Sequence, residues 1–434
     1  ALIGPNRYEW ILCYFAVMAA GGVVVPIDWQ LSLEQATALT TRYRCDLAVD
    51  LRPVRDSSRE ISAQTLYAED IQLLAAGEGE APPKVDGEEA ACVVSSSGTT
   101  GDVKGIVLTH RNLCAVVEGC AKSLNPTGTV LALLPLHHIY AAVISVLVVF
   151  ACGGCVAISG QPSQLREDAM RFAPNYICVV PAVLEAVRRA LEGEARKRGV
   201  RAKYALARGL DRMLRPLGVD LRRALFRRFR DALGGRLTYF VCGGAALSAP
   251  CERFFDEIGI PVLNGYGMTE TAGGICINRL GRIRPGSVGR PIFGVQMRVS
   301  GNLELLIKGD MVAQKYDDGT PTPHDGPWLR TGDLGRVDKD GYFYLTGRIK
   351  NLIILGNGEN VSPEELEALL SRIPCVREVI VSGEGNALCA EFLPDFDELR
   401  ARGLTDARAY LSAEVDRINR ALPPYKAIAI IRVR

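Results

Sequence analysis

The 434-residue sequence lacks the patterns of a membrane-spanning or secreted protein. Its longest charge-free region, residues 123–165, contains an apolar run over 139–154 that is shorter than the ~20 residues a membrane span needs. We therefore predict a buried helix in this run. No signal-peptide pattern is present at the N-terminus, where the first residues already predict a strand. We expect the native chain to begin earlier.

An excess of charge of one sign is also absent, since the formal net charge is +2. This indicates no particular partner, and we expect no nucleic acid. The 13 cysteines are scattered through apolar runs, which is typical of reduced thiols in a cytoplasmic protein. Cys152 and Cys155 have redox or zinc spacing, but no second pair follows. We therefore predict a helix that ends on Gly153 and Gly154 before a strand.

Apolar strands alternate with helical segments up to about residue 300, which predicts an α/β fold. The strand candidates read TVLALLPL, GCVAIS, YICVVP, LTYFVCGG and PVLNGYG. After about 285 the pattern changes to short strands with glycine turns. We predict a large N-terminal domain of mixed sheets with flanking helices over 1–349, with a small β-rich subdomain at about 285–349. A small, mobile α+β domain would follow over 350–434.

Two segments carry distinctive local signals. Ser362 is placed to cap a helix, Pro363 fits its first turn, and Glu365 would complete a capping box. Between residues 196 and 230 basic residues far outnumber acidic ones, and leucines recur at helical spacing. Such a segment can lie on an anionic membrane. The alternative is a solvated helical face that packs its leucines on the domain.

Residues 95–104 form a loop of small hydroxyl residues and glycines within the stretch VVSSSGTTGDVKGIVLTHRN. The hydroxyl groups, and the backbone N–H groups that glycine leaves accessible, suit phosphate. The Walker spacing GxxxxGK[ST] is absent, and a strand follows the loop instead of a helix. A glycine-rich hairpin turn without a ligand is the alternative. The candidate phosphate-binding residues are Ser95, Ser96, Ser97, Gly98, Thr99, Thr100, Gly101 and Lys104.

This loop and the motifs after it resemble the AMP-forming adenylating superfamily, which includes acyl-CoA synthetases, nonribosomal peptide adenylation domains and firefly luciferase. The motifs are PLHHIY at 135–140, GGAALS at 243–248, NGYGMTET at 264–271, GSVGRPIFG at 286–294, WLRTGDLGRVDKDGYFYLTGRIKNLI at 328–353 and NGENVSPEELE at 357–367. They cover nearly the whole chain. The basic segment and LIILGNGENVSPEELE are most similar to bacterial long-chain fatty acyl-CoA synthetases.

The resemblance implies that ATP activates a carboxylic acid, with a fatty acid favoured, to acyl-AMP and pyrophosphate. The acyl group then passes to the thiol of coenzyme A. A carboxylate is a poor acylating agent because its leaving group would be oxide, whereas acyl-AMP releases AMP. Since two anions must meet in the first step, Mg²⁺ and positioned donors are needed to neutralise their charge.

By the same resemblance, Glu270 holds Mg²⁺ and Thr269 donates to the α-phosphate. His138 lies near the carboxylate, with His137 the less favoured choice, and Lys350 is the hinge of the small domain. A solvated carboxylate and a buried structural imidazole are the simpler readings of Glu270 and the histidines.

The nucleotide would stack on Tyr266 opposite a glycine wall, and Asp333 would bind both ribose hydroxyls with help from Arg348. The expected ATP-binding residues beyond the loop are Gly243, Gly244, Ala245, Asn264, Gly265, Tyr266, Gly267, Asp333 and Arg348. The loop expected on the coenzyme A side contains Gly356, Asn357 and Gly358.

Two features depart from the superfamily pattern. Phe293 stands where proline is usual, which we interpret as a packing change. The superfamily also carries an adenylation lysine shortly beyond the position of Arg434, and Lys426 belongs to an earlier motif. Either the sequence continues, or the protein is impaired in adenylation.

We therefore expect a cytoplasmic acid–thiol ligase, with a peripheral contact to the inner face of the membrane through residues 196–230. Transfer of the acyl group to a carrier protein instead of coenzyme A is one alternative. A non-catalytic protein that binds an acyl-adenylate or a nucleotide is the other.

Overall fold

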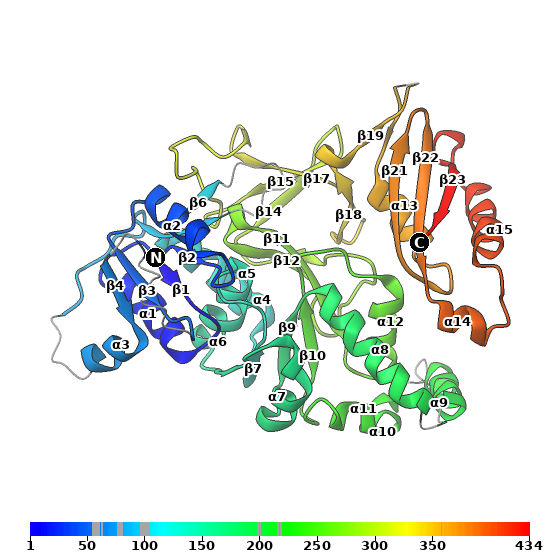
Figure 1. Ribbon diagram of the computed structural model, residues 1–434, viewed down its shortest axis with the longest axis horizontal. Helices are drawn as coiled ribbons and strands as arrows, with labels where there is room; N and C mark the ends of the chain where they lie inside the picture. The colour runs from blue at the N-terminus through cyan, green and yellow to red at the C-terminus, as the bar shows by residue number, and fades with distance from the viewer. Residues whose placement is uncertain are drawn as a thin grey trace.

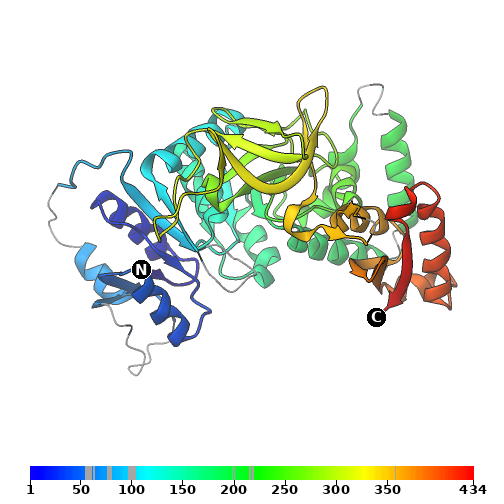
Figure 2. The same cartoon turned by 90° about the horizontal axis from the view of Figure 1, so that it is seen from above.

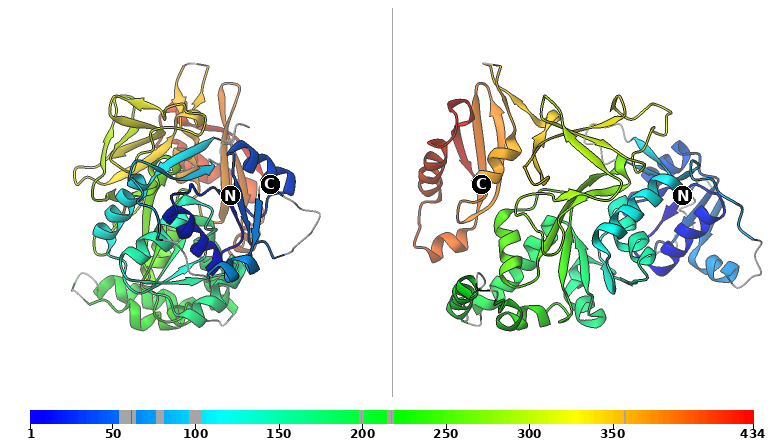
Figure 3. Two further views of the ribbon diagram at one scale, coloured as in Figure 1. Left: turned by 90° about the vertical axis from the view of Figure 1, so that its left-hand side faces the viewer. Right: turned by 180° about the vertical axis from the view of Figure 1, so that it is seen from behind.

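The computed structural model describes residues 1–53, 61, 64–75, 81–95, 104–197, 199, 201–214, 217, 219–356 and 358–434. Figure 1 shows a small sheet at the N-terminal end, a central sheet, a β-rich layer beside it and a separate sheet at the C-terminal end. The same order is visible from above in Figure 2 and from behind in the right-hand view of Figure 3. This confirms the predicted α/β fold with a large N-terminal and a small C-terminal domain.

The N-terminal sheet is parallel, with strand order β2-β1-β3-β4. Its elements are β1 (Leu2–Ile3), α1 (Tyr8–Ala19), β2 (Pro26–Ile27), α2 (Leu33–Arg42), β3 (Leu47–Asp50), β4 (Gln64–Tyr67) and α3 (Ala68–Ala75). Helix α2 begins with a capping box, in which Ser32 and Gln35 each accept from the other's backbone N–H.

The central sheet has seven strands in the order β13-β12-β11-β10-β9-β7-β8. Its parallel strands are β7 (Thr129–Ala132), β8 (Cys155–Ile158), β9 (Tyr176–Val179), β10 (Tyr239–Cys242) and β11 (Val262–Met268), and β12 (Gly273–Ile277) and β13 (Arg290–Pro291) are antiparallel. The helices of this part are α4 (His110–Leu124), α5 (Ile139–Ala142), α6 (Val148–Ala151), α7 (Leu165–Phe172), α8 (Pro181–Lys197), α9 (Arg201–Leu214), α10 (Arg222–Leu225), α11 (Arg227–Asp231) and α12 (Ala249–Glu257). Ligands of such sheets bind beyond the carboxyl ends of the parallel strands.

The apolar run at 139–151 is a continuous helical segment, in which a π-helical stretch, Val143–Leu147, joins α5 to α6. Most of its side chains are buried, which confirms the predicted buried helix. Gly153, with φ of 68°, ends the segment before β8, so the Cys152–Cys155 spacing is the helix-to-strand turn that we predicted. Within the described ranges, no helix has the length and apolar character needed to cross a membrane.

The β-rich layer is antiparallel and consists of β14 (Gln296–Val299), β15 (Glu304–Lys308), β16 (His324–Asp325), β17 (Trp328–Val337) and β18 (Phe343–Arg348). The described residues between Pro285 and Arg348 form no α-helix, as the glycine-turn pattern predicts. Strand β18 carries the chain to the C-terminal sheet.

The C-terminal part has β19 (Ile353–Ile354), β20 (Asn360–Val361), α13 (Pro363–Leu370), β21 (Val376–Glu384), β22 (Ala387–Pro394), α14 (Phe396–Ala401), α15 (Ala407–Asn419) and β23 (Ile428–Val433). Its buried core is its own, formed by side chains between Ile353 and Val433. Ser362 caps α13 by accepting from the Glu365 N–H, but the predicted capping box is wrong. Glu365 instead accepts from Lys426 Nζ at 2.7 Å, because the folded chain brings a charged partner within its reach.

Candidate active site

The loop at 96–103 is anchored at both ends by a hairpin. Strands β5 (Ala90–Ser95) and β6 (Gly105–Thr109) pair antiparallel with Ser95 opposite Gly105, which confirms the predicted strand–loop–strand. The Tyr43 hydroxyl lies 3.0 Å from Ser95 Oγ, and the Gly105 N–H donates to Asp317 Oδ1 at 2.7 Å. A Cβ at Gly105 would lie 2.6 Å from the Tyr43 ring, so this position requires glycine. Ser96, Ser97, Gly98, Thr99, Thr100 and Gly101 lie outside the described residues.

Lys104, at the end of this loop, is exposed and places its Nζ 4.8 Å from the centre of the Tyr316 ring. Burial raises the pKa of Tyr316, and the negative charge of Glu270 raises it further. The Ala313 N–H, three residues before Tyr316, donates to the Glu270 backbone carbonyl at 2.8 Å, so Lys104 and the expected metal ligand both lie near Tyr316. This is the arrangement expected if both act on one phosphate group.

Tyr266, Asp333 and Arg348 form a hydrogen-bonded cluster between β11, β17 and β18. The Tyr266 hydroxyl donates to Asp333 Oδ2 at 2.6 Å, and Arg348 Nε donates to Asp333 Oδ1 at 2.7 Å. The Asp333 side chain is 6% exposed, whereas that of Arg348 is 65% exposed. A carboxylate oxygen can accept two hydrogen bonds, so each Asp333 oxygen keeps one acceptor position for a ligand. Sequence reasoning selected all three residues but missed the Tyr266–Asp333 bond.

Asn264 supplies a buried acceptor on the same strand as Tyr266. Its Nδ2 donates to the Ser287 carbonyl at 3.1 Å, while its Oδ1 has no partner among the described residues. A buried acceptor without a donor is unfavourable, and the exocyclic amine of an adenine is a donor of the required kind. Asn264 therefore fits the expected nucleotide.

The glycines around Tyr266 allow the backbone to approach closely. Strands β11 and β12 change register between Tyr266 and Gly267, and a Cβ at Gly267 would lie 1.8 Å from the Gly273 carbonyl oxygen. At Gly265 the corresponding distance to the Cys276 oxygen is 3.0 Å. The loop after β10 contains Gly243, Gly244 (φ of 84°) and Ala245. The sequence motif thus reflects steric limits at these positions.

Glu270 lies in the short 3₁₀ turn Thr269–Thr271, directly beyond the carboxyl end of β11. Burial raises the pKa of its carboxyl group, the charge of Asp333 raises it further, and those of Arg348 and Lys350 lower it. Glu270 is thus within electrostatic reach of the Asp333 cluster and of the expected hinge. The described residues contain no group of three or more metal-ligating side chains, but Mg²⁺ in nucleotide sites is commonly held by one or two carboxylates together with the phosphates. Glu270 therefore fits a metal of this kind.

His137 and His138 lie side by side, with ring centroids 4.2 Å apart. His137 Nε2 is 3.9 Å from Asp28 Oδ2. Burial lowers the pKa of both imidazoles, so both are neutral at pH 7. Tyr140, two residues on, packs against Gly243: a Cβ there would lie 3.5 Å from its ring. This contact brings the His138 end of α5 to the expected nucleotide wall, and no sequence pattern predicts it.

Lys350 is exposed in the turn Ile349–Asn351 between β18 and the C-terminal sheet. Gly356 and Gly358 lie in the β19–β20 hairpin, and Asn357 lies outside the described residues. A Cβ at Gly356 would lie 2.1 Å from Asn386 Oδ1, so the hairpin packs against the β21–β22 turn. Lys426 forms an ion pair with Glu365 at 2.7 Å.

Comparison with known proteins identifies the class to which this site belongs. The AMP-binding enzyme family model matches residues 1–316, and the AMP-binding enzyme C-terminal domain model matches residues 350–433. The chain belongs to the AMP-binding enzyme family.

Among similar curated proteins is the long-chain-fatty-acid–CoA ligase FadD15 of Mycobacterium bovis, 31% identical over 427 residues, with 88% of this chain and 70% of that protein covered. FadD13 of Mycobacterium tuberculosis, named as the same kind of ligase, is 26% identical over 416 residues, covering 88% and 74%. Sulfoacetate–CoA ligase of Cupriavidus necator is 34% identical over 324 residues, covering 70% and 55%.

Solved structures show the same fold. ATP-bound MatB from Rhodopseudomonas palustris superposes with a TM-score of 0.78 at 23% identity, covering 100% of this chain and 84% of that one. The o-succinylbenzoate CoA synthetase of Bacillus subtilis, in complex with an acyl-adenylate, gives a TM-score of 0.75 at 23% identity, covering 100% and 84%.

Proposed function

We propose that this protein is an ATP-dependent acid–CoA ligase whose acid substrate is a fatty acid. The observation that carries the proposal is the cluster of Tyr266, Asp333 and Arg348 beside Glu270, at the carboxyl end of β11. The ligases FadD15 and FadD13, by their names, act on long-chain fatty acids, which supports this substrate class.

In the first step, an oxygen of the substrate carboxylate attacks the α-phosphate of ATP and pyrophosphate leaves. Asp333 accepts from the ribose hydroxyls, Asn264 Oδ1 accepts from the adenine amine, and Tyr266 packs on the ring. Thr269 donates to the α-phosphate, and Lys104 offsets the charge of the phosphate chain. His138 contributes a neutral hydrogen-bond donor near the substrate carboxylate. A neutral group suits this position because an anionic side chain there would repel the carboxylate.

Mg²⁺, when bound at Glu270, neutralises phosphate charge. In the second step, the thiol sulfur of coenzyme A attacks the acyl carbonyl carbon and AMP leaves. We assign Lys350 as the hinge and the hairpin with Gly356 and Gly358 to the coenzyme A side. The assigned domain boundaries, 1–349 and 350–434, follow from the same proposal.

The test measures carboxylate-dependent ATP–pyrophosphate exchange and, separately, thioester formation with coenzyme A. The acids are a series of fatty acids and sulfoacetate, because a sulfoacetate ligase is also similar to this chain. Fatty acids should support both reactions. Exchange without transfer to coenzyme A would favour a carrier-protein acceptor, and nucleotide binding without exchange would favour a non-catalytic protein.

We also propose that the basic segment contacts an anionic membrane surface. Helix α9 and the residues after it expose Leu206 (76%), Met213 (67%) and Leu217 (75%), so these side chains do not pack on the domain. The aromatic side chains of this segment are different: Phe226 and Phe229 are buried. An exposed apolar face among arginines suits the interfacial region of anionic lipid.

Flotation with vesicles tests this contact. Anionic vesicles should carry the protein at low salt and release much of it at high salt, because salt screens the attraction. A variant with Leu206, Met213 and Leu217 changed to serine should bind less strongly, while Phe15→Ser, at another exposed position, is the matched control. Equal recovery on neutral and anionic vesicles would contradict the contact.

A further inference from the structure

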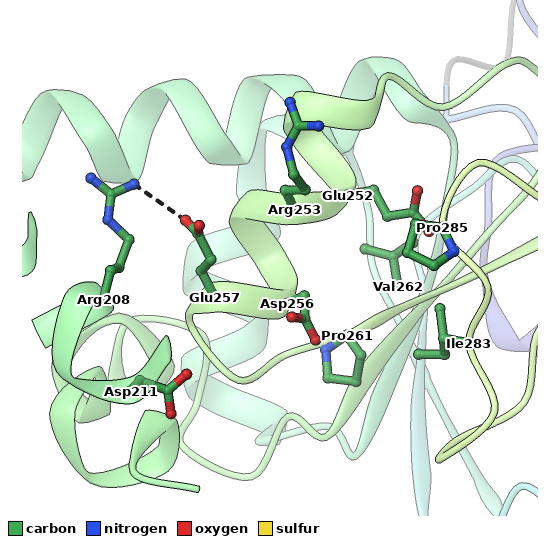
Figure 4. Close-up of a pocket in the computed structure, with 10 residues that line it drawn as sticks. All are labelled: Arg208, Asp211, Glu252, Arg253, Asp256, Glu257, Pro261, Val262, Ile283 and Pro285. Carbon is green, nitrogen blue, oxygen red and sulfur yellow. Dashed lines mark hydrogen bonds and ion pairs between the residues drawn. The ribbon is translucent and has the colours of Figure 1, made fainter. Parts of the chain in front are cut away.

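A cavity of ≈ 620 Å³ lies between α9, α12, the start of β11 and the loop that follows β12. It contains none of the residues assigned to the nucleotide or the acid. Figure 4 shows its lining, with charged side chains from the two helices on one side and apolar side chains from β11 and the loop on the other. The lining residues are Arg208, Asp211, Glu252, Arg253, Asp256, Glu257, Pro261, Val262, Ile283 and Pro285.

All four carboxylates in this cavity accept a hydrogen bond or form an ion pair within the chain. Glu257 pairs with Arg208 at 3.2 Å, and Asp256 pairs with Arg222 at 2.7 Å. Asp211 accepts from the Leu221 N–H at 3.3 Å. The two ion pairs thus offset the charges of Glu257 and Asp256.

Glu252 differs from the other three in having one oxygen without a partner. Its side chain leaves α12 toward the loop with Pro285, on the cavity side, and the residue is only 5% exposed (Figure 4). Its Oε2 accepts from the Gly286 N–H at 2.9 Å, but its Oε1 has no partner in the described part of the chain. Leaving a buried carboxylate oxygen unsatisfied is costly. Burial raises the pKa of Glu252 and the charge of Asp256 raises it further, whereas the hydrogen bond from Gly286 and the charge of Arg253 lower it.

The chemistry of the lining limits the ligand. An anion is excluded as the ligand because the carboxylate of Glu252 would repel it. A metal ion would need several ligating side chains, and no group of three or more such residues occurs in the described ranges. Val262, Ile283 and Pro285 offer an apolar wall next to Glu252. An ammonium group with a short hydrocarbon body satisfies both halves of the cavity.

We propose that this cavity binds an aliphatic primary amine, whose ammonium group donates to Glu252 Oε1 while its hydrocarbon chain packs on Val262, Ile283 and Pro285. Such an ammonium could belong to a simple amine or to an amino acid, and in the second case Arg253, which is exposed at the rim, would face the carboxylate. The proposal does not depend on the ligase function.

Calorimetric titration of the full chain without ATP tests the proposal, with butylamine, norleucine, butanol and tetramethylammonium as probes. Butylamine should bind saturably, and norleucine should bind more tightly only if Arg253 takes part. Butanol lacks the charge and tetramethylammonium lacks N–H donors, so both should bind at least ~10-fold more weakly, as expected for losing a hydrogen bond to a charged group. Equal binding of all four probes, or none by butylamine, would overturn the assignment.

Glu252→Gln should weaken butylamine by a similar factor, because it removes the charge at nearly constant volume. Glu367→Gln is the matched control, because Glu367 is a half-buried glutamate outside the cavity that also accepts from a backbone N–H, that of Val381 at 2.8 Å. It should leave binding close to that of the unmodified chain. Full binding by the Glu252→Gln variant would refute the role of this carboxylate. If that variant does not fold, the ranking of the four probes on the unmodified chain decides.

Discussion

Replacing Asp333 by asparagine tests the centre of the proposed nucleotide site. The amide keeps one oxygen acceptor and presents an NH₂ group at the other position. Tyr266 is 7% exposed, whereas the Arg348 side chain is 65% exposed. The asparagine should therefore turn its oxygen toward the buried Tyr266 hydroxyl and its NH₂ toward Arg348, which can move into solvent.

The cost follows from these two contacts. A hydrogen bond to a charged group contributes ~1.5–3 kcal/mol and a neutral one ~0.5–1.5 kcal/mol, so the Tyr266 bond weakens by about 1 kcal/mol. The exposed Arg348 pair contributes ~0–1 kcal/mol. We expect Asp333→Asn to lower the free energy of unfolding by ~1–2 kcal/mol in denaturant titration. The KM for ATP should rise by ~10–100-fold, because the ribose loses a charged acceptor.

Comparison of ATP with 2′,3′-dideoxy-ATP separates ribose recognition from general damage. The unmodified chain should prefer ATP, and Asp333→Asn should reduce that preference. Tyr266→Phe is the matched variant, since it removes the other partner of Asp333 Oδ2 but keeps the carboxylate and the ring. It should destabilise the fold while retaining discrimination between the two nucleotides. An unchanged preference in the Asp333→Asn variant would refute the assigned contact with ribose.

Two further predictions concern buried titratable groups. Glu270→Gln should slow pyrophosphate release by ~10²–10³-fold. Because folding raises the pKa of Glu270, its contribution to stability is present below the ordinary pKa and is lost as pH rises through the raised pKa. Glu270→Gln should therefore unfold at a higher denaturant concentration at pH 7. Turnover at the unmodified rate would exclude a catalytic role for Glu270. His137 is neutral when folded, because burial lowers its pKa, and it takes up a proton on unfolding below pH ~6.5. The free energy of unfolding should therefore fall as pH drops from ~6.5 toward the lowered pKa. His137→Gln should reduce this dependence on pH in denaturant titrations. An unchanged dependence would mean that other groups cause it.

Features with a local signal could be predicted from the sequence. The two strands on either side of the loop at 96–103, the buried helix in the apolar run 139–154 and the cap at Ser362 each depend on neighbouring residues, and all three are present. The π-helical stretch Val143–Leu147 was not predicted, because an apolar run does not distinguish one helical hydrogen-bond pattern from another.

Contacts between residues far apart in the sequence could not be predicted from local patterns. The Tyr266–Asp333 bond joins positions 67 residues apart, and no spacing rule links them. Glu365 shows the same limit. Its local sequence pattern predicts a capping box, but its carboxylate accepts from Lys426, 61 residues away. A charge-assisted bond to a half-buried ammonium is stronger than a bond to an exposed backbone N–H. Tertiary contacts can therefore override a local motif.

The contacts on either side of Lys350 bear on its proposed role as a hinge. Ser362 Oγ donates to the Thr346 carbonyl at 2.6 Å, and Asn351 Nδ2 donates to Glu364 Oε1 at 2.6 Å. The Ser362 bond ties the start of α13 to β18, on the other side of Lys350, whereas the Asn351 bond lies within the part of the chain that follows Lys350. Both bonds are at least partly open to water. Each contributes ~0.5–3 kcal/mol at most, and water can replace it when it breaks. Rotation at Lys350 would thus cost little free energy and would leave the Asp333 cluster intact. A two-step ligase requires an intact nucleotide site, because the nucleotide must stay bound while the small domain moves.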